Sequence, residues 1–311
     1  MTGDLTPNYP SLDSLDSNIT NQIGNTPLLE LRNIWSHPTI KVYAKAEWTN
    51  LGGSVKARPA FNMIQKGIKE GKLTKDKIIF DSTSGNTGIA YAVIGAALGY
   101  KVTLVVPENV TEKRKEMMRR YNAEIIFSSP MEGSDGATRL AEKILAENPE
   151  KYFFPDQYGN DANWQAHAST AEEVFAQTNG KITHFAAGMG TSGTVMGTGR
   201  FLKEKNSEIQ IYSVQPDSSF HGLEGMKHME TTIVPAIYNK SELDGQIDIS
   251  TEDAYDMVDL LKSKEGLEVG FSSGANVCAA LKLAQEAAKT TPNKEASIVT
   301  ILADSKACYD S

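Results

Sequence analysis

This sequence has little cysteine and fewer basic than acidic residues, and each of these facts excludes a class of protein. The two cysteines, Cys278 and Cys308, are too few for a disulfide framework and lack the spacing of zinc ligands. The 31 Lys and Arg residues are outnumbered by 39 Asp and Glu, and the net charge of −8 argues against a nucleic-acid-binding surface. We therefore expect a protein of a reducing compartment, with no metal site and no nucleic-acid partner. Cys278 lies in a helical apolar pattern, which favours a buried structural thiol.

Long hydrophobic runs are also missing. The longest uncharged apolar stretch, near residues 89–99, is too short to span a bilayer. The N-terminus lacks the basic start and apolar centre of a signal peptide. These observations predict no membrane partner and a cytoplasmic location. Residues 1–18, rich in Asp, Ser, Asn, Thr and Pro, are expected to form a loose arm.

Apolar β-rich runs alternate with helical patterns along the rest of the chain. Strands are expected over 41–47, 78–80, 102–106, 124–127, 184–187, 209–214 and 297–302. Helices are expected from 60 onward and over 88–98, 113–121, 137–147, 193–204 and 275–289. This alternation predicts an α/β fold with mostly parallel sheets, and the length predicts two domains. Ligands of such sheets bind beyond the carboxyl ends of the strands, in the turns that lead to helices.

One such turn carries a lysine, Lys56, within Gly-Gly-Ser-Val-Lys-Ala-Arg-Pro at residues 52–59. It lies between the strand-like run 41–47 and the helical pattern that begins at Ala60. A lysine partly removed from water there can attack a carbonyl and form a Schiff base. The alternative is a solvated lysine at the start of a surface helix, which is the more frequent situation for this residue type.

Two further strand-to-helix turns carry glycine and hydroxyl residues, at 82–88 and 188–194. Backbone N–H groups at the start of a helix can bind a phosphate or a carboxylate, and glycines let the backbone approach it. Either turn alone could equally be an ordinary helix cap. Neither has the Gly-Lys-Ser or Gly-Lys-Thr of a Walker loop, and the second does not satisfy the dinucleotide fingerprint.

A reactive lysine and two anion-binding turns are together what pyridoxal 5′-phosphate requires. The sequence resembles the pyridoxal-phosphate-dependent cysteine synthase and cystathionine β-synthase family, of the tryptophan-synthase-β fold type, over essentially its whole length. It looks most similar to the shorter cysteine synthase B branch. The motifs that carry the resemblance occur in the family's order, at residues 23–28, 53–56, 83–88, 190–194 and 270–275.

The resemblance implies a role for each motif residue. Lys56 would bond the cofactor's aldehyde carbon and move the substrate's α-proton, Asn86 would bond the cofactor's phenolic oxygen, and Ser272 would face the pyridine nitrogen. The substrate carboxylate would be held by Thr83, Ser84, Gly85, Thr87 and Gln157. The cofactor phosphate would be held by Gly190, Thr191, Ser192, Gly193 and Thr194.

The implied activity is β-replacement on an activated serine. O-acetylserine would lose acetate through an aminoacrylate intermediate, and sulfide would add to give cysteine. Lys227 falls where some relatives carry an arginine, so O-phosphoserine or thiosulfate remains an alternative, as does another thiol or amine nucleophile. Lys227 could also be a solvated surface lysine. A pyridoxal-phosphate-binding protein without turnover is a further alternative.

The resemblance also implies an architecture and an assembly. Residues 51–155 would form a smaller, mobile domain, and 1–50 with 156–311 the larger one, with the cofactor in the cleft between them and a homodimer as the assembly. The sequence departs from the family pattern at Leu51, where proline is usual, at Ala57, where aspartate is usual, and around Lys306, where relatives have a glycine and an arginine. The segment Ser-Thr-Ala-Glu-Glu at 169–173 replaces a turn of the family pattern and is one residue shorter. These departures bear on the identity of the substrate more than on the identity of the cofactor.

Overall fold

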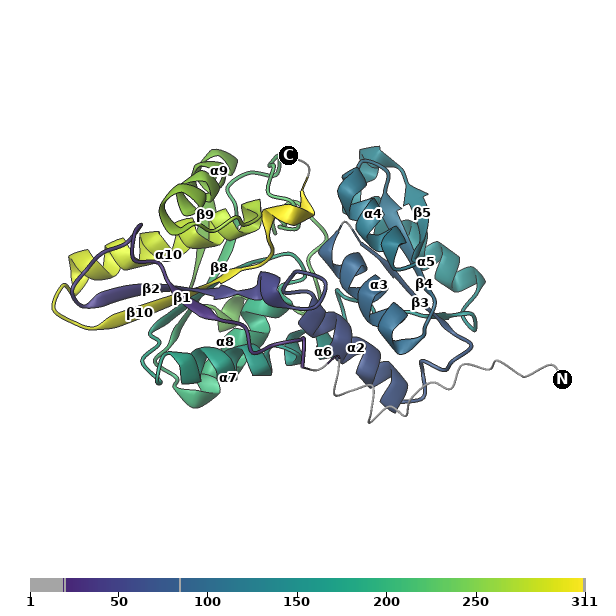
Figure 1. Ribbon diagram of the computed structural model, residues 1–311, viewed down its shortest axis with the longest axis horizontal. Coiled ribbons are helices and arrows are strands. Elements are labelled where there is room, and N and C mark those ends of the chain that lie inside the picture. Colours follow the sequence, from purple (N-terminus) through teal and green to yellow (C-terminus); the bar gives the residue numbers. More distant parts are fainter. Residues whose placement is uncertain (1–18, 20, 84, 310–311) are drawn as a thin grey trace.

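The computed structural model describes residues 19, 21–83 and 85–309, and these form two sheets side by side (Figure 1). The expected arm at 1–18 lies outside the described residues. The larger sheet has the order β1 (Leu28–Glu30), β2 (Ile40–Ala46), β10 (Ala296–Leu302), β7 (His184–Gly188), β8 (Gln210–Pro216), β9 (Gly245–Ile249). The smaller has the order β5 (Glu124–Ser128), β4 (Val102–Pro107), β3 (Ile78–Ser82), β6 (Tyr152–Phe153).

The strands of both sheets pair in parallel, except that β1 pairs with β2 in the antiparallel sense. The central strands are continuous apolar runs because helices cover both faces, and β4 is buried at every residue. The predicted α/β class with mostly parallel sheets is therefore confirmed.

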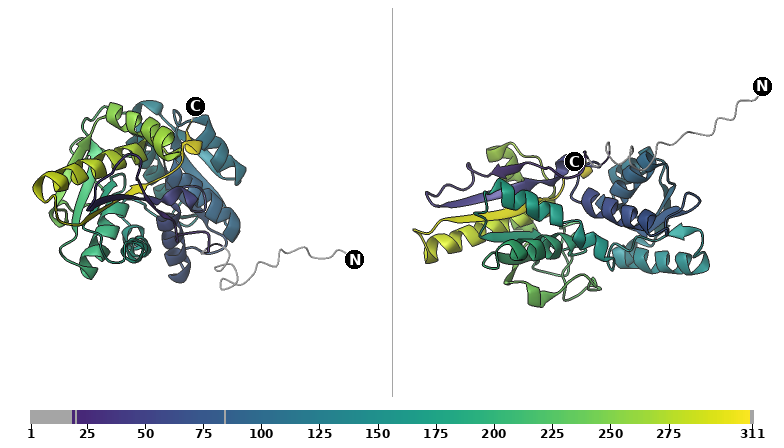
Figure 2. Two further views of the ribbon diagram at one scale, coloured as in Figure 1. Left: turned by 60° about the vertical axis from the view of Figure 1, so that its left-hand side comes forward. Right: turned by 90° about the horizontal axis from the view of Figure 1, so that it is seen from below.

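Helices flank each sheet separately (Figures 1 and 2). The smaller sheet is accompanied by α2 (Ala57–Lys69), α3 (Asn86–Leu98), α4 (Glu112–Arg120) and α5 (Gly133–Glu147). The larger sheet packs against α7 (Ala168–Gln177), α8 (Gly193–Lys205), α9 (Thr251–Leu260) and α10 (Phe271–Thr290). The short helix α6 (Asp161–Gln165) contacts both α2 and α8 and so links the two parts. Within the described part of the chain, no helix is long and apolar enough to cross a membrane.

The differences from the sequence-based expectations concern short elements and boundaries. The strands β1, β6 and β9 and the helices α6, α7 and α9 have no counterpart among the predicted elements. Residues 169–173, which replace a turn of the family pattern, lie inside α7, with the side chains of Thr170 and Ala171 buried. Helix α10 starts four residues before the expected position, which places Ser272 in its first turn.

Candidate active site

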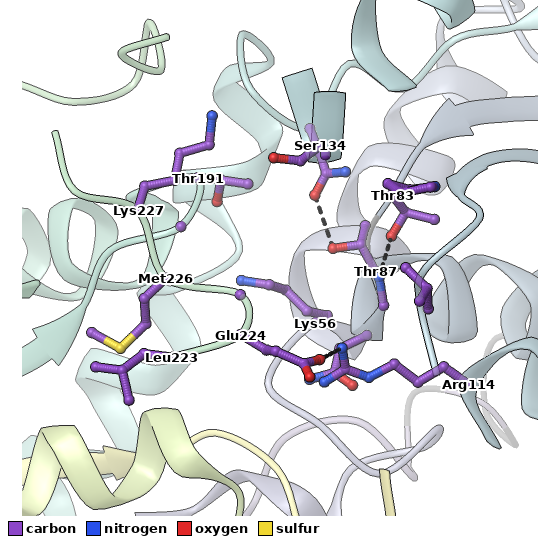
Figure 3. A pocket seen from close by; sticks show the side chains of 18 of the residues that line it. Lys56, Thr83, Thr87, Arg114, Ser134, Thr191, Leu223, Glu224, Met226 and Lys227 are labelled. Atoms are coloured by element: carbon purple, nitrogen blue, oxygen red, sulfur yellow. Dashed lines mark hydrogen bonds and ion pairs between the residues drawn. The ribbon is translucent and has the colours of Figure 1, made fainter. Parts of the chain in front are cut away.

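A cavity of about 530 Å³ opens between the two sheets, at the carboxyl ends of β3 and β7. Its lining includes Lys56, Thr83, Thr87 and Thr191, which Figure 3 labels, and also Gln157. A smaller cavity of about 60 Å³ shares Lys56, Asn86 and Gly190 with the larger one and is lined also by Thr194 and Ser272. The structure thus brings together all three turns singled out in the sequence. Ser84 lies outside the described residues.

Lys56 is the residue that immediately precedes α2, and its side chain extends into the cavity (Figure 3). It is half-buried, so it differs from the solvated surface lysine considered above. Burial lowers the pKa of the Lys56 amine below its ordinary value, against the attraction of the buried Asp304 carboxylate. A lysine with a lowered pKa has more of the neutral amine that a Schiff base requires.

A buried ion network holds the backbone that carries Lys56. Arg58, two residues further on, donates to both carboxylate oxygens of Glu47 at 2.8 Å and to Glu173 at 2.8 and 2.9 Å. Lys45 contacts the same Glu173 carboxylate at 2.6 Å. Burial alone would favour the neutral form of Glu173, but the Arg58 guanidinium and Lys45 lower the pKa of Glu173 to about 2. The network joins the start of α2 to β2 and α7, and thereby fixes the position of Lys56.

The departure at Leu51 has a local explanation. The Leu51 N–H donates to the Gln22 carbonyl at 2.9 Å, a hydrogen bond that proline could not make. Ala57, the second departure, is fully buried at the start of α2. Both residues are therefore part of the packing around the lysine turn.

In the first anion-binding turn, the side chains of two threonines are oriented differently. Thr83 Oγ1 accepts hydrogen bonds from the N–H groups of Gly85 at 3.1 Å and Gly88 at 3.0 Å. A hydroxyl has two acceptor positions and one proton, so these bonds leave the Thr83 proton to donate to a ligand. Thr87 instead donates to Gln157 Oε1 at 2.8 Å, and Gln157 Nε2 donates to the Ser82 carbonyl at 2.6 Å. Gln157 is thus held against the turn by its own hydrogen bonds.

The second turn repeats the arrangement seen at Thr83. Thr191 Oγ1 accepts from Asn163 Nδ2 at 3.1 Å and from the Gly193 N–H at 3.3 Å, which leaves its proton for a ligand. Asn163 Nδ2 also donates to the Gln157 carbonyl at 2.6 Å, so the two turns are connected through Gln157 and Asn163.

The second turn fits a phosphate group. Ser192, the N-cap of α8, has a φ of +67° and makes no side-chain capping bond, and its buried Oγ has no hydrogen-bond partner in the described protein. A Cβ at Gly190 would lie 2.4 Å from the Gly225 carbonyl oxygen, so the backbone there comes closer than a larger residue would allow. An unpaired hydroxyl, together with the backbone N–H groups at the N-terminus of a 13-residue helix, can donate hydrogen bonds to an anion. With the Lys56 amine in the same cavity, the residues present fit pyridoxal phosphate.

Asp304, which the sequence did not single out as a site residue, lies buried beside the cofactor-binding candidates. It accepts from Asn86 Nδ2 at 2.6 Å and from the Tyr309 hydroxyl at 3.0 Å. Burial raises the pKa of the Asp304 carboxyl, while Asn86 and Tyr309 act in the opposite direction. The Asn86 side chain is oriented by this contact, and its buried Oδ1 has no partner in the described protein. Ser272 makes no cap for α10, whose N-cap is Gly270.

Residues 221–227, called the mouth segment below, form one wall of the larger cavity. Lys227 belongs to this wall and is 8% exposed, so the reading as a solvated surface lysine is wrong. Its Nζ lies 3.4 Å from Asp135 Oδ1 on α5, and 4.8 Å from the centre of the Tyr158 ring. Glu224 pairs with Arg114 on α4, as the dashed line in Figure 3 shows. Arg114 and Glu224 were also missed in the sequence.

The cysteines lie away from the cavity lining and are both buried, as expected for Cys278. Burial raises the pKa of each thiol to about 11. Neither is therefore a ready nucleophile.

Residues 19–304 match the family model of the pyridoxal-phosphate-dependent enzymes, and the chain belongs to this family. It is 46% identical over 286 residues to a cysteine synthase of Aquifex aeolicus, covering 91% of this chain and 87% of the relative. It is 39% identical over 283 residues to cysteine synthase B of Pseudomonas aeruginosa, covering 91% of each. Among solved structures it is similar to the cysteine synthase of Entamoeba histolytica, with a TM-score of 0.86 and 36% identity over 93% of this chain and 87% of that one.

These similarities confirm the predicted family, the dependence on pyridoxal phosphate and an enzyme of the cysteine synthase type. The roles of the individual site residues remain predictions.

Proposed function

We propose that this chain synthesises cysteine from O-acetylserine and sulfide, with acetate as the leaving group. The observation that carries the proposal is the cavity itself. It combines the partly desolvated Lys56 amine with two threonine hydroxyls, Thr83 and Thr191, whose protons are left to donate to anions. The cysteine synthase relatives support the same activity.

Pyridoxal phosphate, when bound, supplies the electron sink that makes the α-proton of the amino acid acidic. We assign Lys56 to attachment of the cofactor and to transfer of that proton at its Nζ. Gly190, Thr191, Ser192, Gly193 and Thr194 would hold the phosphate, Asn86 would bond the phenolic oxygen, and Ser272 would face the pyridine nitrogen. The Ser272 hydroxyl cannot supply the charge of an aspartate, so it leaves the ring a weaker electron sink, which favours elimination over transamination.

The turn at 83–88 is assigned to the substrate carboxylate. Thr83 donates its free hydroxyl proton, and Gln157 contributes the second hydrogen of its amide, because the first is used by the Ser82 carbonyl. The Thr87 hydroxyl supports Gln157, and Gly85 lets the backbone approach the ligand. Lys227 contributes to the wall that faces the rest of the substrate.

We further propose that residues 51–155 form the smaller, mobile domain, which closes on the larger one when the substrate carboxylate binds and so excludes water. The enzyme is proposed to be a cytoplasmic homodimer with no nucleic-acid, membrane or metal partner. The homodimer is tested by light scattering of the purified protein.

The experiment for the activity is an absorbance scan of the purified protein followed by titration with O-acetylserine and then sulfide. A visible cofactor band that changes with O-acetylserine and returns with sulfide, with cysteine released, is the expected result. A band that O-acetylserine does not change would refute the proposed substrate.

A further inference from the structure

The mouth of the cavity contains two cations, and each is already paired with a carboxylate. Arg114 pairs with Glu224, and Lys227 lies 3.4 Å from Asp135. The mouth segment supplies the acidic residue of the first pair, Glu224, and the basic residue of the second pair, Lys227. Arg114 comes from α4 and Asp135 from α5, so both pairs also join the mouth segment to the smaller sheet's helices.

Arg114 is enclosed on several sides. Its guanidinium lies over the Tyr309 ring, 4.7 Å from the ring centre. A Cβ at Gly85 would lie 3.0 Å from its Nη1, so the guanidinium packs against the backbone of the turn assigned to the substrate carboxylate. Arg114 is 3% exposed, whereas the Glu224 side chain that covers it is 43% exposed and faces the mouth.

Lys227 is enclosed in a similar way. Besides Asp135, its Nζ donates to the Ile233 carbonyl at 3.2 Å and lies over the Tyr158 ring. Each cation therefore has one carboxylate and one aromatic ring as neighbours, and the four charges sum to zero.

This arrangement bears on the leaving group. A phosphate group carries about two negative charges near neutral pH and is bound in proteins by cations or N–H donors directed at it. The acetyl ester is uncharged and needs no such partner. With the substrate amine on the cofactor beside Lys56 and the carboxylate at the turn 83–88, the leaving group would face the walls formed by the mouth segment and by residues within 107–110 and 133–134. It would meet the Glu224 carboxylate there and two cations whose charge is already neutralised.

We propose that Glu224 and Asp135 are specificity-determining residues, which neutralise Arg114 and Lys227 and thereby select a serine ester with an uncharged leaving group over O-phosphoserine. This inference rests on the proposed function and adds a reason for the choice of ester. In this proposal Lys227, neutralised by Asp135, is part of the cavity wall and does not bind a phosphate group.

The test compares kcat/KM of the holoenzyme for O-acetylserine and O-phosphoserine at fixed sulfide, in the wild type and in Glu224→Gln, Asp135→Asn and the double variant. The wild type should prefer O-acetylserine. Each single substitution should raise the phosphoserine-to-acetylserine ratio about tenfold, because it exposes one cation at short range in a partly buried site. The double variant should raise it further, and added salt should reduce the gain.

Glu242→Gln is the matched control. Glu242 pairs with Arg200 at 2.6 Å and does not line the cavity, so its loss should leave the ratio unchanged. Retention of the visible cofactor band shows that each variant is folded and loaded. Inhibition by inorganic phosphate gives a second readout, since phosphate should bind more tightly to Glu224→Gln than to the wild type.

A wild-type preference for O-phosphoserine, or a ratio and phosphate affinity unmoved in both single variants, would overturn the inference and leave cysteine synthesis standing. Failure of the wild type to form cysteine from either ester would overturn both the inference and the proposed function.

Discussion

Asn163 Nδ2 donates a hydrogen bond to Thr191 Oγ1 at 3.1 Å and another to the Gln157 carbonyl at 2.6 Å. One buried amide therefore connects the turn assigned to the cofactor phosphate with the residue assigned to the substrate carboxylate. A Cβ at Gly193 would lie 2.0 Å from Asn163 Oδ1, so the amide also packs directly on the backbone of the phosphate turn. The hydrogen bonds of Asn163 therefore fix the position of the phosphate turn relative to Gln157.

Thr191→Val is expected to weaken the binding of pyridoxal phosphate to the apoprotein. Valine keeps the shape but removes the hydroxyl proton that would meet the phosphate, a charge-assisted hydrogen bond worth about 1.5–3 kcal/mol. The dissociation constant should rise about tenfold to hundredfold in an equilibrium titration. Thr191→Ser keeps the hydroxyl and should remain close to the wild type. Equal affinity of the valine and serine variants would contradict the role given to this hydroxyl.

Lys56→Ala should abolish both the visible absorption of the lysine-linked cofactor and cysteine formation, because no other amine is assigned to the attachment. Lys69→Ala, at an exposed position near the end of the same helix, is the control and should retain both. Absorbance of the purified variants after dialysis is the measurement. A Lys56→Ala protein that keeps the band and the turnover would refute the assignment of the lysine.

The site residues that could be found from the sequence are marked by the residues next to them in the chain. Lys56, Thr83 and Thr191 each lie in a glycine-containing turn between an apolar strand and a helix, and parallel sheets place such turns at one edge. The strands and helices around them were also recognisable because they are long or strongly apolar. Strand β6, with two residues, and strand β1, with three, are too short for such a pattern.

The residues that were missed act through contacts distant in the chain. Asp304 contacts Asn86, a residue 218 positions away in the chain, and Arg114 and Glu224 are 110 residues apart. Before folding, Arg114 is one of several charges on a helix, and Glu224 is one acid in a loop. Only the packing of α4 against the mouth segment pairs them, and no periodicity records that packing. The sequence left the burial of Lys227 open for the same reason, because that burial depends on Tyr158 and Asp135.

Arg58→Met should destabilise the protein by about 3–5 kcal/mol, because it leaves the fully buried Glu47 carboxylate without its charged partner. Urea unfolding of the apoprotein measures the change. Arg32→Met is the control, since Arg32 pairs with Glu30 but has a side chain 74% exposed, and should cost less than about 1 kcal/mol. Adding Glu47→Gln to Arg58→Met should recover part of the lost free energy of unfolding. A double variant less stable than Arg58→Met alone would show that the destabilisation does not come from the unpaired charge.

Glu173 should make the free energy of unfolding depend on acid pH. Its pKa is about 2 in the folded protein, against 4.5 for an ordinary glutamate side chain. A lowered folded-state pKa means that the stabilisation is fully present above the unfolded-state value and is lost as the pH falls through the folded-state value. The stabilisation amounts to about 3 kcal/mol, from the difference of the two pKa values at 1.36 kcal/mol per unit.

In urea titrations, Glu173→Gln should be less stable than the wild type at neutral pH, and the difference in free energy of unfolding should disappear between about pH 5 and pH 2. Glu172→Gln, at the exposed neighbouring position, should follow the wild type throughout. A gap between Glu173→Gln and the wild type that stays constant down to pH 2 would mean that Glu173 contributes through packing and not through its charge.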